Sequence, residues 1–200
     1  MKKRFFSGIC FVAIGTIISM NVFAEGDVNR GKAKYKVCIA CHGENGGGIK
    51  ITNAPRIAGQ KSWYLKRQLY NFKNGVRGSH LNDITGMQMR TMALSLNNDQ
   101  DIDDVVAYIG TLNGRGKQTN LDGDTKAGEK AYAVCISCHG ANGEGNKALN
   151  APTIAGQQDW YIARQLYNFK NGIRGSHPED TYGQQMRPMS MSLVDDTAIK

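Results

Sequence analysis

Two short motifs of cysteine and histidine are the residues of this sequence best suited to cofactor chemistry. Each has the pattern C-x-x-C-H, formed by Cys38, Cys41 and His42 in one case and by Cys135, Cys138 and His139 in the other. Two thiols at this spacing can add to the vinyl groups of one porphyrin, and the next imidazole can then bind the iron. The sequence therefore predicts two covalently bound haem c groups.

Two other uses of paired cysteines fit less well. An exported chain could form a disulfide within each C-x-x-C, as thiol oxidoreductases do, but a histidine follows each pair and no βαβ pattern surrounds it. The doubled C-x-x-C also resembles half of a zinc ribbon. The two pairs lie 97 positions apart, which is far beyond the usual spacing of zinc ligands.

The elements around the motifs form a tandem repeat with the same 97-residue offset. Residues 59–80 and 156–177 share 17 of 22 residues, and both contain W-Y-x-x-R-Q-L-Y-N-F-K-N-G-x-R-G-S-H. Two copies indicate a duplication rather than a solenoid, which usually needs three or more repeats. The chain is therefore expected to hold two similar small domains.

The ends of these domains follow from composition. Residues 1–24 read as a signal peptide, with a basic start, a short apolar stretch and cleavage after Ala24. That stretch is short for a membrane span, and Cys10 is removed with it. We expect a first domain at 25–112, a linker rich in Gly, Asn, Asp and Thr at 113–124, and a second domain at 125–200.

Within a unit, the pattern of apolar residues is helical. The sequence predicts helices over 28–37, 63–74 and 99–112, with Gly-rich and Met-rich loops between them and no sustained strand alternation. The fold class is therefore all-α, with each unit wrapped around its cofactor.

A ligand for the far side of each iron can be sought among residues that both units share. Met87 aligns with Gln184, and Met191 aligns with Leu94, so both methionines drop out if the two sites are alike. The pairs that remain are Met92 with Met189, Met89 with Met186, and His80 with His177.

Local chemistry favours the pair Met92 and Met189. Each is expected at the end of a loop, just before Leu96 or Leu193 and the start of a helix with acidic residues in its first turn. Pro188 fixes the backbone just before Met189. A thioether is a soft ligand suited to haem iron, while the other two pairs stay open.

Pro55 and Pro152 each lie 13 residues beyond a motif histidine. A metal-bound imidazole usually donates its second N–H to a carbonyl, and a stiffly held prolyl carbonyl is a candidate acceptor. An ordinary loop proline is the alternative.

These features together resemble the cytochrome c4 family, exported dihaem proteins built from two class I cytochrome c domains. The resemblance spans the whole mature chain and rests on the C-x-x-C-H-G segments, the Ala-Pro and Ala-Gly-Gln loops, the Tyr-x-x-x-Gln-Leu helices and the Met-Arg-x-Met runs. It implies iron ligation by Met92 and Met189 and hydrogen bonds from the histidines to Pro55 and Pro152. It also implies electron shuttling in the periplasm towards a terminal oxidase.

The expected function is that of an electron carrier and not of an enzyme. Redox proteins are the expected partners: a membrane cytochrome complex as donor and a terminal oxidase or a dehydrogenase as the other partner. These redox partners are compatible with peripheral membrane association of the protein. Nucleic acid is not an expected partner. A dehydrogenase subunit or a dihaem peroxidase are the rival functions. Residues 25–116 carry a net charge of +5 and residues 117–200 a net charge of 0, which could orient the molecule on an acidic partner.

The second unit departs from the first at its end. The helix expected over 99–112 should pack on the helix that carries Tyr35, but its counterpart begins at Asp196, and Lys200 is the last residue. We therefore expect a shortened last helix in the second domain. With less to pack against Tyr132, the second haem pocket is expected to be more open and less stable.

Overall fold

The computed structural model describes residues 26–115 and 121–199, and these residues form helices joined by loops, with two isolated β-bridges. The predicted signal peptide at 1–24 and residues 116–120 of the predicted linker lie outside the described residues. None of the described helices is long and apolar enough to cross a membrane. The all-α prediction is confirmed for the described chain.

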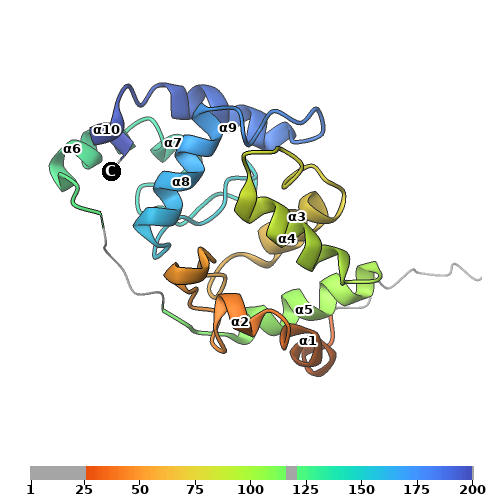
Figure 1. Cartoon of the computed structure of the whole chain (residues 1–200). Coiled ribbons are helices and arrows are strands. Elements are labelled where there is room, and N and C mark those ends of the chain that lie inside the picture. The colour runs from red at the N-terminus through yellow and green to blue at the C-terminus, as the bar shows by residue number, and fades with distance from the viewer. Residues whose placement is uncertain (1–25, 116–120, 200) are drawn as a thin grey trace, which may run out of the picture.

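The first domain contains five α-helices and one short 3-10 helix (Figure 1). They are α1 (Val28–Tyr35), α2 (Ile39–His42), η1 (Lys50–Thr52), α3 (Ser62–Lys73), α4 (Ile84–Leu94) and α5 (Asp99–Thr111). Helix α5 starts at a cap in which Asn98 accepts a hydrogen bond from the Asp101 N–H, and acidic residues in its first turn complement the helix dipole. Its apolar face packs on α1, as the sequence predicts, and also on α3.

The core of the first domain lies between α1, α3 and α5. Tyr35 is 1% exposed, and its ring centre is 5.3 Å from that of Tyr108 on α5. The other buried members of this cluster are Leu65, Leu96, Ile102, Val105, Val106 and Ile109. Burying side chains of this size is the main source of stability in a small domain.

The second domain repeats the same order of helices. They are α6 (Thr125–Tyr132), α7 (Ile136–His139), α8 (Asp159–Lys170), α9 (Thr181–Met191) and α10 (Asp196–Ile199). Four residues of α10 stand where the first domain has the thirteen of α5, and α10 packs on α6. The buried apolar cluster of this domain is small, with Ala163, Leu193 and Ile199 as its members.

The Met-rich segments form helices, so the prediction of loops there was wrong. Met92 lies inside α4, and Met189 lies inside α9. Asp83 and Asp180 cap these helices, because their side chains accept hydrogen bonds from the backbone N–H three residues on. The many polar residues and Pro188 hid the helical pattern, although α9 accommodates the proline near its end.

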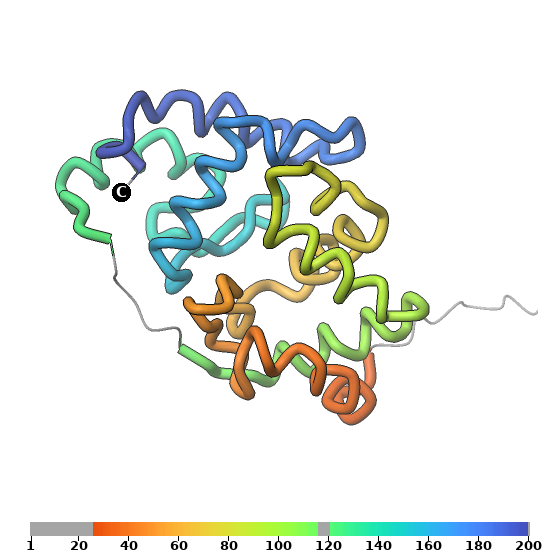
Figure 2. The backbone as a smooth tube through the Cα atoms, in the orientation of Figure 1, coloured from red at the N-terminus to blue at the C-terminus, as the bar shows by residue number. Residues whose placement is uncertain are grey.

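The two domains contact each other mainly through α3, α8 and the loops that follow the C-x-x-C-H motifs (Figure 2). Arg67 of the first domain contacts Asn150 of the second, and the equivalent residues Arg164 and Asn53 make the same contact in the opposite direction. The interface therefore has an approximate two-fold symmetry. The two motif loops therefore lie close to the domain boundary.

Candidate haem-binding sites

His42 is the buried histidine of the first motif, with 5% of its surface exposed. Its Nδ1 lies 2.8 Å from the carbonyl oxygen of Pro55. A carbonyl can only accept a hydrogen bond, so Nδ1 carries the proton and Nε2 keeps its lone pair. Burial lowers the pKa of His42, against the smaller opposing effect of the Pro55 hydrogen bond, so the imidazole is neutral at pH 7. A neutral imidazole with a free Nε2 is the form that binds a metal.

The second motif has the same arrangement. His139 is 7% exposed, and its Nδ1 lies 2.9 Å from the carbonyl oxygen of Pro152. The hydrogen bonds expected for both prolines are therefore present in the structure. Iron ligation by the two histidines remains a prediction, but both rings are in the tautomer that ligation requires.

The loops after the histidines explain how the prolyl carbonyls reach the rings. Gly43 ends α2 with a φ of 79°, and its carbonyl accepts a hydrogen bond from the Tyr35 hydroxyl. The loop then closes at the bridge between Ile49 and Ala54, where Asn53 takes a φ of 57°. The second domain repeats each feature at positions 97 residues higher. Glycine and asparagine adopt positive φ most readily, so these residue types permit the turn.

The four motif cysteines form no disulfide in this structure. Cys38 and Cys135 are half-buried, whereas Cys41 and Cys138 are exposed. Burial raises the pKa of Cys38 to about 11 and also raises that of Cys135. The thiols and the histidine of each motif lie on one turn of helix, which suits attachment to one porphyrin.

The candidate methionine ligands lie on two faces of α4 and α9. Met186 and Met189 are three residues apart and share one face of α9, whereas Met191 lies about 200° around the helix from Met189. Met89 and Met92 share a face of α4 in the same way. Met92 is partly buried and Met189 is 44% exposed. Helix geometry keeps the two paired candidates of each domain together, so it leaves the choice between them open.

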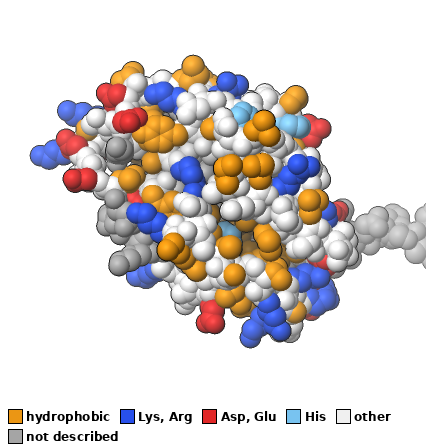
Figure 3. Space-filling model, viewed as in Figure 1, with side chains coloured by type: hydrophobic (Ala, Val, Ile, Leu, Met, Phe, Trp, Pro, Cys, Tyr) orange, Lys and Arg blue, Asp and Glu red, His pale blue; other side chains and the backbone are white. Residues whose placement is uncertain are grey.

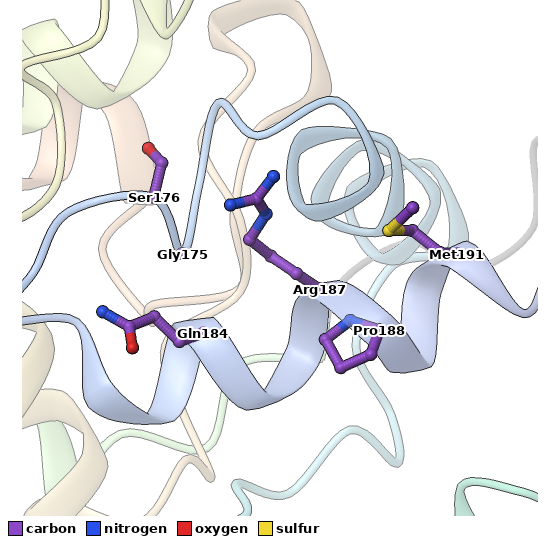
Figure 4. Close-up of a pocket in the computed structure, with 6 residues that line it drawn as sticks. All are labelled: Gly175, Ser176, Gln184, Arg187, Pro188 and Met191. Atoms are coloured by element: carbon purple, nitrogen blue, oxygen red, sulfur yellow. The ribbon is translucent and has the colours of Figure 1, made fainter.

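A pocket of about 400 Å³ lies over another face of α9 (Figure 4). Met191, Pro188 and Gln184 line it from the helix, and the side chain of Arg187 extends towards the loop at Gly175. Met191 therefore faces a surface hollow that Met189 does not line.

His80 and His177 lie in the turns before α4 and α9. Each Nδ1 accepts a hydrogen bond from the backbone N–H two residues later, at 3.1 Å and 3.2 Å. In the neutral ring the proton is then on Nε2, which is the opposite tautomer from that of His42. These local turn contacts make His80 and His177 weaker candidates for iron ligation.

Buried arginines at the domain boundary supply a test of whether haem fits. Arg77 and Arg174 are nearly fully buried, and the buried Nε atom of each has no hydrogen-bond partner within the described residues. Their terminal nitrogens donate to the neutral Oε1 atoms of Gln68 and Gln165. Burial and the neighbouring Arg174 lower the pKa of Arg77, whereas the pKa of Arg174 is raised because Tyr64, Tyr161 and Asp180 outweigh its burial. Asp83 and Asp180 thus attract these groups, but the buried Nε donors have no hydrogen-bond partner in the described chain and would suit the two propionates that each haem carries.

A second pair of arginines crosses the boundary and was missed from the sequence. Arg67 donates to the side chain and carbonyl of Asn150, and Arg164 donates to the same two groups of Asn53. Each asparagine lies two residues before the proline that orients the motif histidine of its own domain. Both arginines and both asparagines are identical in the two repeats, and that identity was the available signal.

The comparisons with known proteins agree with this geometry. The family model for cytochrome c matches residues 28–113 and 125–200. Cytochrome c4 of Azotobacter vinelandii is 34% identical over 166 residues, which cover 76% of each chain.

The chain belongs to the cytochrome c4 family.

A crystal structure of reduced recombinant cytochrome c4 from Pseudomonas stutzeri has a TM-score of 0.67 and 31% identity, covering 87% of this chain and 94% of that one. A protein of Stutzerimonas stutzeri strain A1501 named thiosulfate dehydrogenase electron acceptor is 30% identical, covering 88% of this chain and 82% of that one. Membership of this family makes the chain a dihaem electron-transfer cytochrome with two covalently bound haem c groups.

Proposed function

We propose that the chain is a periplasmic carrier of single electrons between respiratory-chain partners, with a membrane cytochrome complex as donor and a terminal oxidase as acceptor. The haems supply the one-electron chemistry, and the protein supplies fixed ligands and a shielded environment. The observation that carries the proposal is the matched geometry of His42 and His139, since each buried ring uses Nδ1 in a hydrogen bond to a prolyl carbonyl and so keeps Nε2 free to bind a haem iron.

In this proposal each domain supplies two ligands to its own haem iron. His42 and Met92 would hold the first iron, and His139 and Met189 would hold the second. Cys38 and Cys41 attach the first haem, and the second is attached by the cysteines at the matching positions, Cys135 and Cys138. A haem held by two protein side chains would exchange electrons without binding a substrate, which suits a carrier better than an oxidising enzyme.

The ligand assignment is tested by the far-red absorption band that a thioether bound to ferric haem produces. Met92→Leu and Met189→Leu are each expected to remove about half of the band, because each abolishes one of two similar thioether bonds. Met89→Leu and Met186→Leu are the matched controls, being on the same faces of the same helices. If the control variants lose the band instead, the iron ligands are Met89 and Met186, one helical turn earlier.

A second candidate function is the electron-accepting subunit of a dehydrogenase. The relative named thiosulfate dehydrogenase electron acceptor favours it. Rapid reduction of the purified cytochrome by a thiosulfate dehydrogenase, with slow reduction by a membrane cytochrome complex, would select this function. Hydrogen peroxide turnover by the purified protein would contradict both carrier functions and support a peroxidase.

A further inference from the structure

The side chain of Gln158 belongs to the second domain but is buried in the first. It is 2% exposed. Its Oε1 accepts a hydrogen bond of 2.8 Å from the Arg56 backbone N–H, and its Nε2 donates one of 2.8 Å to the Gly47 carbonyl. A single amide group thus bridges two segments of the first domain's motif loop.

The Arg56 N–H is chemically coupled to the ligand histidine. It forms one peptide group with the carbonyl of Pro55, which accepts the hydrogen bond from His42 Nδ1. Hydrogen bonds in series through one amide polarise and strengthen each other. The contact from Gln158 therefore makes the Pro55 carbonyl a stronger acceptor for the His42 proton.

The second domain lacks this arrangement. Lys61 stands at the position equivalent to Gln158, and both residues are the N-cap of the helix that follows. A lysine side chain has no hydrogen-bond acceptor, so Lys61 cannot receive the N–H of Thr153, which follows Pro152. In the described residues, Gln60 contacts Thr153 at its carbonyl oxygen, which belongs to the next peptide group.

We propose that Gln158 is a positioning residue through which the second domain tunes the first haem iron. This inference rests on the proposed iron ligation by His42. A stronger hydrogen bond from Nδ1 gives the imidazole more negative charge and raises its basicity as a ligand. A more basic ligand stabilises ferric iron, so Gln158 lowers the reduction potential of the first haem and leaves that of the second unchanged.

The test compares two adjacent glutamines in the full-length holoprotein. Gln158→Leu removes the bond to the Arg56 N–H. Gln157→Leu is the matched control, because Gln157 also crosses the boundary but donates to the Arg56 carbonyl, in the neighbouring peptide group. Both potentials are measured in a redox titration in which NMR resolves the signals of each haem.

Gln158→Leu is expected to raise the first potential only, and Gln157→Leu to change neither. In the reduced protein, the His42 Nδ1–H resonance should move upfield in Gln158→Leu as its hydrogen bond weakens. Equal shifts of both potentials, no shift, or the same shift in Gln157→Leu would overturn the proposal.

A substitution at the position equivalent to Gln158 tests the proposal even if Gln158→Leu does not fold. Lys61→Gln gives the second domain the missing acceptor and is expected to lower the second potential while leaving the first unchanged. An unchanged second potential in a folded Lys61→Gln protein counts against the proposal. NMR spectra of the wild type test the proposed iron ligation by His42 separately. If His42 shows no resonances of an iron ligand, that ligation is wrong, and the proposed role of Gln158 is wrong with it.

Discussion

The two domains differ in how their first helices are covered, although their motif loops are nearly identical. In the first, Tyr35 is buried beneath α5, whereas no residue of α6 is fully buried and α10 provides only a short cover. The hydrogen bonds from the tyrosine to the glycine carbonyl are nevertheless alike, at 2.8 Å and 2.7 Å. Local turns therefore set the geometry of each candidate haem site, and the outer helix contributes mainly stability.

The largest expected difference concerns one pair of equivalent isoleucines. Ile102 is fully buried in α5, and Ile199 is its counterpart in α10. Ile102→Ala is expected to destabilise the first domain by about 3 kcal/mol through lost burial and a cavity, and Ile199→Ala the second by about 2 kcal/mol, because Ile199 is buried in a smaller cluster. Urea unfolding followed by the signals of each haem measures both. Equal losses would show that α10 covers its domain as well as α5 does.

A smaller effect is expected at Asp104, which has no counterpart in the described second domain. Its carboxylate accepts hydrogen bonds from the Arg30 guanidinium, the Asp27 N–H and the Gln100 amide. The hydrogen bond from Arg30 is the main reason that the pKa of Asp104 lies well below its usual range, and the other two act in the same direction against burial. The stabilisation is present above the usual aspartate pKa near 4 and is lost as the pH falls towards the lowered value.

Asp104→Asn should therefore lower the melting temperature of the first domain at pH 7. The melting temperature of the variant should also fall less than that of the wild type as the pH is lowered. Asp103→Asn is the control on the same helix, since Asp103 forms a more exposed ion pair with Lys66, and such pairs contribute little. Thermal unfolding of each domain between pH 2 and pH 7 measures the effect. If the melting temperature of Asp104→Asn falls in acid as steeply as that of the wild type, this carboxylate is not the source of the pH dependence.

Much of this molecule could be predicted from residues that act locally. Apolar periodicity located α1, α3 and α5 to within two residues at each end, and the C-x-x-C-H spacing located the candidate sites. The helices α4 and α9 were missed because their exposed faces are polar or methionine-rich, so the apolar period is weak there. The contacts of Arg67 and Gln158 were beyond reach, because long polar side chains at a boundary resemble solvated ones until the partner domain is placed.

The smallest expected difference lies in how the two domains attract a partner. Lysines and arginines gather over α1 (Figure 3), and Lys32 and Lys36 form no ion pair within the described residues. The equivalent residues are Glu129 on α6 and Ala133 at the C-cap of α6. Both positions lie just before a C-x-x-C-H motif, and Val37, next to Lys36, is exposed. An acidic redox partner should therefore approach the first domain.

Giving the first domain the equivalent residues of the second, with Lys32→Glu and Lys36→Ala, should slow reduction by a small acidic electron-donor protein at low salt. The expected loss is roughly twofold per unit of charge, since two charges about 10 Å apart in water interact by about 0.4 kcal/mol. The difference from wild type should shrink as salt screens the charges. Lys126→Ala with Lys130→Ala, on α6, is the control and should change the rate less. A rate that is independent of salt in the wild type would mean that charge does not select between the domains, and that docking depends on apolar contacts common to both motifs.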